Sequence, residues 1–558
     1  MKSGAWVMLG VGGLALGVAL LLQVWRPYYF LTDDSLRLAW PVLVESGYAR
    51  QAGLDPDESQ FLFGGGYRLD RDAMFTPNRH PLMAGLSRLA GTEWELAMVD
   101  AWCVVQAVLA AVGFAWMAWV LGQQTWRDGQ SLAPAGSWLV GLLALSYTFN
   151  GYTLYLGASG FWYWANVAAL PWMVGGLWDR NVWRGGLVLG LGAWHMAVGG
   201  YPGCTVYAGL FLALLAVVRW WNAPGERWRL AGGWAVAGGV AGVAAWPWLG
   251  PVVMALPESV RGGPIPVEAA AEKAMPVAVL IGSWFVSVLS APLGSFETFG
   301  VKAYAYGLAA CPMAWFFWCA LKGERRWNGW DGWLGFLVVM TVVLITRPVW
   351  LSWILAHVPV LGSLRWPYKE VFLFLFALHV WMLRGTRMEL DKAGLVVGVG
   401  LIFFLAPLVI FGPPTLNAAE ADREALISGR AREWGRNLAE AVRETRGVAP
   451  VLPPWALEDV EAYVALPALP LVSHNYPAYF RIAAPSGYSA TLPEEVFYRE
   501  PRAANVYGVF REGDGERLRA MGWSTVTLVE DEERFRVEVM RPDGERVWLE
   551  PLPSGRKR

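Results

Sequence analysis

Two adjacent carboxylates, Asp33 and Asp34, closely follow the first long apolar run of the sequence. A carboxylate at a membrane surface can accept a proton from a hydroxyl group, and it can also bind a divalent cation through oxygen. The same stretch could instead cap a helix that runs through Leu36–Val44, and the two roles are compatible. We therefore take Asp34, with Asp33 as its alternate, as the candidate catalytic residues.

Cationic side chains form the second group of candidates. Arg365 and Lys369 lie one helical turn apart, and a guanidinium group can hold a phosphate through two hydrogen bonds. Both side chains could instead extend toward water beside the interfacial aromatic residues Trp366 and Tyr368. Arg261 is a further cation that we expect near the membrane surface.

The segment Thr76–Pro81 contains two more side chains that could face a phosphate, Arg79 and His80. The alternative is a rigid turn that returns the chain to the membrane surface. The nearby run Gly64–Gly66 permits positive φ angles, but it lacks the lysine and the strand-to-helix context of a phosphate loop. We expect most of the carboxylates around this run to be solvated loop charges.

The composition is that of a membrane protein. Of the 558 residues, 55% are hydrophobic and 16% are charged, 35 are tryptophan, and the formal net charge is −1. An ordinary soluble domain carries about 25% charged residues, so a plain soluble enzyme is excluded, and the charge balance implies no basic surface for nucleic acid. The four cysteines form no CxxC or Cys/His cluster, which argues against a structural zinc site or a disulfide framework.

Apolar runs long enough to cross a bilayer recur along the chain. We predict eleven spans, at about 4–25, 97–121, 133–149, 160–178, 183–199, 202–220, 230–250, 303–321, 332–346, 367–383 and 393–411. Lys and Arg concentrate in alternate short connections, which predicts a cytoplasmic N-terminus and an extracytoplasmic C-terminus. The run 276–291 could be a twelfth span, a re-entrant hairpin or an interfacial helix.

The predicted fold is an α-helical polytopic membrane protein with a small α/β domain outside the membrane. Residues 1–411 form the transmembrane domain, which includes a large first outer loop at 26–96. Residues 412–558 form the tail domain. Its sequence predicts a polar helix at about 418–446, followed by short strand-like runs at 463–466, 506–510, 525–529 and 534–540.

Three ionisable residues lie at the predicted membrane depth, where such groups are functional candidates by default. They are Asp100, His195 and His379. Asp100 lies near a span end and could reach the interface, and each histidine is more simply explained as a hydrogen-bonded packing residue. The sequence shows no ladder of charges through the spans, which argues against a proton-coupled pump.

Taken in order along the chain, these features resemble the GT-C superfamily of membrane glycosyltransferases and, within it, the bacterial YfhO-like proteins. The resemblance rests on short motifs spread over most of the chain: Asp34-Ser35 followed by Pro41, Gly64-Gly65 followed by Pro77-Asn78 and Pro81-Leu82, Gly200-Tyr201-Pro202-Gly203, Pro257 with Ser259 and Arg261, Leu364-Arg365-Trp366-Pro367, and Gly487-Tyr488. The turn at 200–203 departs from the family's Gly-His-Pro-Gln because it lacks both the His and the Gln.

The resemblance implies an enzyme that takes a sugar from a polyprenyl-phosphate carrier at the outer face and transfers it, usually with inversion, to an acceptor. It implies that Asp34, or Asp33, acts as the base on the acceptor hydroxyl. It also implies contacts to phosphate or sugar from the cationic candidates: Arg365, Lys369, Arg79, His80 and Arg261. Some members of the superfamily use a divalent cation, but this sequence shows no further acidic motif for the site, so we expect no metal requirement.

The expected partners are a polyprenyl-phosphate-linked sugar donor, a glycan or lipid acceptor of the cell envelope, and membrane lipid, in the plasma membrane of a bacterium. Two other functions stay open. A transporter or flippase of lipid-linked glycan would be built from pseudo-symmetric halves, which the sequence does not show. A non-catalytic envelope-assembly protein would keep the fold without the reaction.

Overall fold

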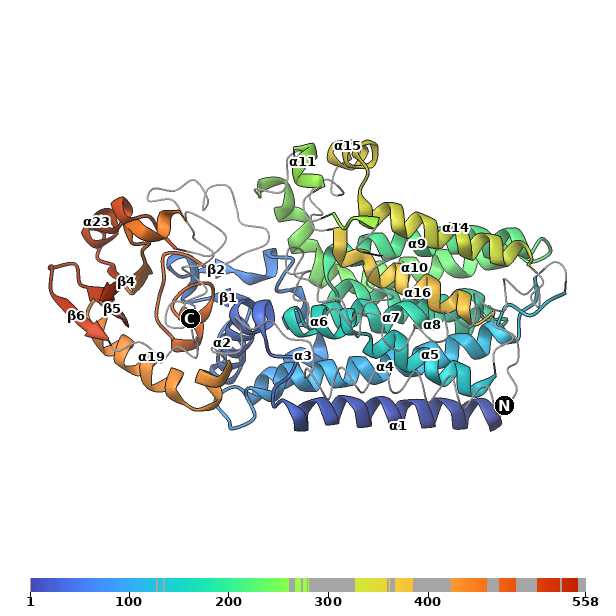
Figure 1. Ribbon diagram of the computed structural model, residues 1–558, viewed down its shortest axis with the longest axis horizontal. Helices are drawn as coiled ribbons and strands as arrows, with labels where there is room; N and C mark the ends of the chain where they lie inside the picture. Colours follow the sequence, from blue (N-terminus) through green and yellow to red (C-terminus); the bar gives the residue numbers. More distant parts are fainter. Residues whose placement is uncertain are drawn as a thin grey trace.

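A computed structural model describes residues 2–126, 129–133, 136–259, 266–271, 274–277, 280, 327–358, 361, 367–384, 423–458, 471–487, 509–531 and 534–549. A bundle of helices forms one end of the elongated molecule, and the tail domain forms the other (Figure 1). The first outer loop lies between them, so any site built from that loop has the bundle on one side and the tail domain on the other.

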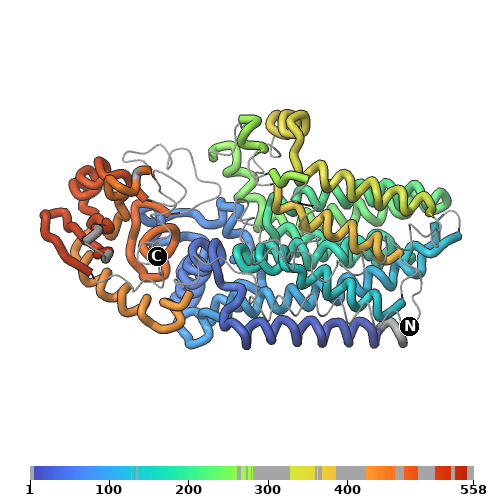
Figure 2. The backbone as a smooth tube through the Cα atoms, in the orientation of Figure 1, coloured from blue at the N-terminus to red at the C-terminus, as the bar shows by residue number. Residues whose placement is uncertain are grey.

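The bundle consists of apolar helices, which satisfy their own backbone hydrogen bonds and can therefore cross a bilayer. Its described helices are α1 (Lys2–Trp25), α4 (Ala97–Gly122), α5 (Ser137–Phe149), α6 (Gly151–Ser159), α7 (Tyr163–Trp178), α8 (Val182–Gly199), α9 (Pro202–Asn222), α10 (Arg227–Ala255), α14 (Gly329–Thr346) and α16 (Val371–Met382). Short helices η6 (Leu256–Glu258), α11 (Val267–Ala270), α15 (Val349–His357) and η9 (Pro367–Glu370) join them. Figure 2 shows α1 running beside α4, and α14 beside α16.

Five helices in the described part of the chain are long and apolar enough to cross a membrane: Ala5–Trp25, Ala97–Gly122, Pro202–Asn222, Arg227–Glu258 and Gly329–Thr346. Each coincides with a predicted span. Four further predicted spans, 133–149, 160–178, 183–199 and 367–383, contain helices that are shorter or less apolar. The predicted spans 303–321 and 393–411 lie outside the described residues, as does most of 276–291. The total of eleven spans stays a prediction.

One end of the bundle gathers several of the connections predicted to be cytoplasmic. Arg384 follows α16 and pairs with Asp331 at the start of α14, at 3.1 Å. Arg384 also donates to the backbone carbonyl of Ser131, and Arg180 donates to that of Gln123. These contacts bring connections that are distant in sequence to one end, as an alternating topology requires.

The first outer loop is folded into short elements rather than being an extended connector. They are η1 (Ser35–Ala39), α2 (Trp40–Ala52), β1 (Glu58–Ser59), η2 (Leu62–Gly64), β2 (Tyr67–Arg68), η3 (Leu69–Arg71), η4 (Thr76–Arg79), α3 (Pro81–Leu86) and η5 (Ser87–Leu89), with β1 antiparallel to β2. The glycines of the run Gly64–Gly66 have φ angles of 86°, 90° and 72°, a conformation that the sequence predicted they could adopt.

The tail domain contains a four-stranded sheet in the order β3-β4-β5-β6. The strands are β3 (Val448–Pro450), β4 (Ser524–Asp531), β5 (Arg534–Met540) and β6 (Arg546–Leu549), and the described helices are α19 (Arg430–Ala441), η10 (Pro454–Leu457), α21 (Tyr476–Phe480) and α23 (Glu512–Ala520). The β3–β4 pair is parallel and the other pairs are antiparallel. The predicted runs 525–529 and 534–540 form β4 and β5. Of the run 506–510, Phe510 makes an isolated bridge with Val451, whereas 463–466 and the boundary at 412 lie outside the described residues.

The tail domain is joined to the first outer loop by backbone hydrogen bonds at the glycine run. The Ala484 N–H donates to the Phe61 carbonyl at 2.7 Å, and the Gly64 N–H donates to the Ala484 carbonyl at 2.7 Å. The Phe63 N–H donates to the Ser486 carbonyl at 3.3 Å. The positive φ angles of Phe63 and the following glycines therefore serve to turn the loop against the tail domain.

Glu45 on α2 is a buried carboxyl group that binds the segment just before the glycine run of the first outer loop. The Ser59 hydroxyl lies 2.9 and 2.8 Å from its two oxygens, and the Gln60 N–H donates to it at 2.8 Å. Burial raises the pKa of Glu45 from 4.5 to about 7, although these hydrogen bonds act in the opposite direction. Glu45 therefore holds a proton in the folded chain at pH values where it has lost it in the unfolded chain.

This linkage predicts that the folded chain loses stability as the pH rises from about 4.5 to about 7, because ionising a buried carboxyl group is costly. The contribution is on the order of 3 kcal/mol. Glu45→Gln removes the titrating group, so its thermal unfolding temperature in detergent should vary less between pH 5 and pH 8 than that of the wild type. Glu93→Gln, on an exposed part of the same loop, is the control. An unchanged pH dependence in Glu45→Gln would contradict this assignment.

Candidate active site

Asp33 and Asp34 lie half-buried in the turn between α1 and η1. Asp33 has a φ angle of 45°, a conformation that costs a residue other than glycine about 1–3 kcal/mol and needs support from its surroundings. The Ser159 hydroxyl at the end of α6 donates to Asp33 Oδ2 at 2.5 Å, and the Phe161 N–H donates to Ser35 Oγ at 2.8 Å. Two hydrogen bonds thus hold this turn against the α6–α7 connection.

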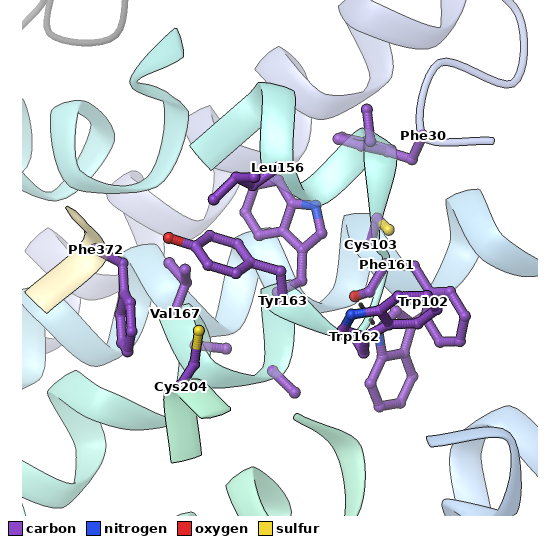
Figure 3. Packing of buried hydrophobic residues seen from close by; sticks show 14 of the residues in the cluster. Phe30, Trp102, Cys103, Leu156, Phe161, Trp162, Tyr163, Val167, Cys204 and Phe372 are labelled. Carbon is purple, nitrogen blue, oxygen red and sulfur yellow. Dashed lines mark hydrogen bonds between the residues drawn. The ribbon is translucent and has the colours of Figure 1, made fainter. Parts of the chain in front are cut away.

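Buried aromatic side chains fix the α6–α7 connection in place. The Trp102 indole N–H donates to the Phe161 carbonyl at 3.2 Å, a contact drawn in Figure 3. Phe30, just before the carboxylates, packs edge-on against Trp164 with the ring centroids 5.5 Å apart. The turn that carries Asp33 and Asp34 is therefore set on a rigid base.

Asp100 is also part of this base, although the sequence suggested that it could reach the interface. It is 6% exposed and accepts hydrogen bonds from the Gln23 side chain at 2.6 Å and from the Phe30 N–H at 3.0 Å. Asp100 on α4 therefore fixes the end of α1 and the path of the chain into the turn.

Lys369 reaches the same region from η9. The Tyr152 hydroxyl donates to the Tyr368 carbonyl, and the Tyr163 hydroxyl donates to the Lys369 carbonyl at 3.4 Å. The Lys369 ammonium group lies 4.4 Å from the centroid of the Tyr201 ring, within the range of a cation–π interaction. Tyrosines from α6 and α7 thus hold the backbone of η9, and the Tyr201 ring faces its lysine.

Tyr368 on η9 is linked electrostatically to the two carboxylates. The Tyr368 hydroxyl interacts electrostatically with Asp33, Asp34, Tyr155 and Tyr201. The Tyr201 ring in turn contacts the Lys369 ammonium group. Tyr368 is thus linked electrostatically to the two predicted carboxylates and to Tyr201, whose ring contacts the predicted lysine. We call Tyr155, Tyr201 and Tyr368 the tyrosine cluster.

Arg79 is placed elsewhere, in the packing between the first outer loop and α10. Its Nε atom lies 3.0 Å from Asp57 Oδ1. Its other two nitrogens donate to the carbonyls of Trp248, at 3.2 Å, and Pro247, at 3.4 Å. These contacts bind the guanidinium group to other parts of the protein, so we do not propose Arg79 as a residue that binds the phosphate of the sugar donor.

His80 is buried against α8 rather than facing a phosphate. The Leu82 N–H donates to its Nδ1 atom at 3.3 Å, so its Nε2 atom carries the proton and donates to His195 Nδ1 at 3.1 Å. His195 Nε2 then donates to Gln106 Oε1 at 2.8 Å. Burial, and next the proximity of His195, lower the pKa of His80 to about 3. A neutral His80 offers no positive charge for a phosphate.

Of the other predicted residues, one has a packing role and two lie outside the described residues. His379 is buried and bonds Ser146 Oγ at 2.8 Å and the Leu375 carbonyl at 2.7 Å, as expected of a packing histidine. Arg365 and Arg261 lie outside the described residues. Within the described ranges, no group of three or more His, Cys, Asp and Glu side chains could hold a metal ion.

Four residues of the site are not identified as functional by the sequence, among them Tyr155 on α6. Tyr201 was noted as a departure from a family turn, and Tyr368 as an interfacial anchor. Ser159 gave no signal, because a serine at the end of an apolar helix is commonplace. Tyr201 follows α8, and its N–H donates to the Asn166 side chain at 2.6 Å, which orients the turn that carries its ring.

No protein-family model and no curated protein sequence matches this chain. Among solved structures, the chain is similar to the arabinofuranosyltransferase AftD from Mycobacteria, determined by cryo-electron microscopy. The sequence identity is 13% and the TM-score is 0.50. The match covers 93% of this chain but 36% of AftD, so the chain spans about a third of the length of that enzyme.

At this identity the similarity shows the fold. The chain shares a fold with a glycosyltransferase, in agreement with the fold expected from the GT-C resemblance. The YfhO-like resemblance is not matched by these comparisons and stays a prediction.

Proposed function

We propose that this chain is an integral membrane glycosyltransferase that moves a sugar from a polyprenyl-phosphate carrier to a glycan or lipid acceptor of the cell envelope. The proposal is supported by the electrostatic link of Asp33 and Asp34 to Tyr368, together with the Lys369 ammonium group over the neighbouring Tyr201 ring. A base and a cation are the two groups that this transfer needs from a protein. The fold shared with an arabinofuranosyltransferase supports the same class of reaction.

In the proposed reaction, Asp34 accepts the proton of the acceptor hydroxyl as its oxygen attacks the anomeric carbon of the donor sugar. The bond between that carbon and the phosphate oxygen breaks, and polyprenyl phosphate leaves with the electron pair. Lys369 stabilises the negative charge on the departing phosphate. Asp33 accepts the Ser159 hydrogen bond and serves as the alternate base. Arg365 and Arg261 stay proposed donor-binding residues, with no contact described.

We place the reaction on the outer face of a bacterial plasma membrane. The cationic connections gathered at the opposite end of the bundle, including Arg180 and Arg384, support a cytoplasmic location for that end. The tail domain and the first outer loop would then lie outside the cell.

The direct test uses the full chain, purified and reconstituted in lipid vesicles. Radiolabelled polyprenyl-phosphate sugars, beginning with arabinofuranose and including hexoses, are supplied together with an envelope extract as the source of acceptor. Labelled glycan together with released polyprenyl phosphate would support the proposal. Movement of intact donor across the bilayer without cleavage would favour a transporter. If neither transfer nor movement is observed, a non-catalytic assembly protein is favoured.

Lys369→Met is expected to raise the donor KM about tenfold and to lower kcat, because the variant keeps an unbranched side chain of similar length without its charge. Lys369→Arg keeps a cation over the Tyr201 ring, so it should stay within about threefold of the wild type. Initial rates measured over a range of donor concentrations give both constants. A donor KM unchanged in Lys369→Met would remove this residue from the donor site.

A further inference from the structure

The segment that follows the two carboxylates is a π-helix, an uncommon element that is frequent at functional sites. It covers Ser35–Ala39, and the Trp40 N–H donates to the Ser35 carbonyl. Pro41 comes next and has no N–H group. In an α-helix the carbonyl of Arg37 would accept from residue 41, which here is the proline and has no N–H to donate.

Asn475 of the tail domain donates to this carbonyl and to the next one. Its backbone N–H donates to the Arg37 carbonyl at 3.2 Å. Its side-chain Nδ2 donates to the next carbonyl, that of Leu38, at 2.9 Å. Asn475 is fully buried, so these bonds are made out of contact with water, where leaving a carbonyl unpaired would cost about 1–3 kcal/mol.

The surrounding tail residues keep Asn475 in place. His474, the residue before Asn475, has a φ angle of 53°. Helix α21 begins directly after Asn475 and packs on α2. The Tyr479 ring of α21 lies 4.5 Å from the Trp40 ring, centroid to centroid. Arg432 pairs with Glu95 of the first outer loop at 2.7 Å. The contact of Asn475 with η1 is thus part of an extended packed interface.

The carboxylate turn is therefore held from two sides. On one side, Ser159 and the Phe161 N–H bind Asp33 and Ser35. On the other side, Asn475 binds the carbonyls of the π-helix that the turn leads into. A small rotation of this helix would move Asp34 relative to the tyrosine cluster.

We propose that Asn475 is a positioning residue, through which the tail domain sets the geometry of the Asp33 and Asp34 carboxylates. This inference rests on the proposed function, in that the geometry is the one needed for sugar transfer. The tail domain then forms part of the catalytic unit, whether or not it also binds glycan. Asn475 acts through the π-helix and does not itself touch the substrate.

Asn475→Ala removes the side-chain donor and keeps the backbone N–H. We expect kcat to fall about 10-fold to 100-fold, the scale of a small misplacement of a reacting group, with the donor KM within about twofold of the wild type. Asn475→Asp places an oxygen against the Leu38 carbonyl, so its kcat should fall at least as far as that of Asn475→Ala. Asn437→Ala, the same change on the exposed face of α19 in the same domain, should leave both constants unchanged.

Amide hydrogen exchange supplies a readout that does not depend on activity. In Asn475→Ala, peptides covering residues 33–44 should exchange faster, while peptides from β4 and β5 should match the wild type. Exchange at 33–44 equal to that of Asn437→Ala would overturn the proposal. Faster exchange throughout the tail domain would overturn it as well, because it would show general loosening.

The two proposals can fail separately. If the wild-type chain transfers no sugar, the proposed function fails, and hydrogen exchange alone decides whether Asn475 holds the π-helix. If the wild type is active and Asn475→Ala keeps the full kcat, the positioning role fails and the proposed function stands.

Discussion

Asp34→Asn is expected to lower the rate of sugar transfer about 10²-fold to 10⁴-fold, the contribution typical of a general base. The amide has nearly the same shape as the carboxylate but cannot accept the proton of the acceptor hydroxyl at neutral pH. The donor KM should change little, because the proposed donor contact is Lys369. The measurement is initial transfer rate in vesicles, with the amount of folded protein checked by gel filtration.

Two matched variants make this result specific to Asp34. Asp70→Asn changes a carboxylate of the same loop that is paired with Arg68 at 2.9 Å, and it should keep nearly the full rate. Asp33→Asn still accepts the Ser159 hydrogen bond through its side-chain oxygen, so its loss should be smaller than that of Asp34→Asn. Full activity of Asp34→Asn would show that another group is the base, and Asp33 would be the next one to test.

Arg384→Met is expected to destabilise the bundle by about 3–5 kcal/mol, because it removes one member of a buried ion pair with Asp331. The Arg384 and Asp331 side chains are 4% and 0% exposed. Asp331 also takes part in the capping of α14, where the Asn328 N–H donates to its side chain at 3.1 Å. Thermal unfolding in detergent measures the loss.

The double variant Asp331→Asn/Arg384→Met removes both charges and keeps an oxygen for the Asn328 N–H. It should recover more than half of the stability lost in Arg384→Met, since removing both members of a buried pair costs less than removing one. Arg180→Met, an exposed arginine at the same end of the bundle, should cost less than about 1 kcal/mol. A double variant as unstable as Arg384→Met would show that the charge of Asp331 is not the cause.

Much of the fold could be predicted because its signals are local. In a bilayer, an apolar run as long as 97–121 satisfies its backbone hydrogen bonds by forming a helix, and α4 forms there at Ala97–Gly122. The alternating strands β4 and β5 follow from side-chain pattern and turn residues in the same way. The family resemblance singled out Asp34 and Pro41 as a pair, but it did not say what the proline does.

The site itself depended on contacts between residues far apart in the chain. Asn475 and Leu38 are 437 residues apart, and no local pattern links them. Arg79 was a reasonable phosphate ligand by sequence, but its neighbours in space, Asp57 and the carbonyls of α10, occupy its donors. Whether a charged group is available to a ligand is decided by its partners, and these are chosen by tertiary packing.

The sequence by itself determined that this is a membrane protein, where the apolar helices of the described residues lie, and which carboxylates stand next to the first of them. Those properties follow from hydrophobicity and periodicity, which act over a few residues. Only the tertiary structure decided that Asp33 and Asp34 interact electrostatically with Tyr368, next to Lys369, and that the tail domain bonds the π-helix that follows them. The physical reason is that hydrogen bonds and charge interactions act over a few ångströms in space, whatever the separation along the chain.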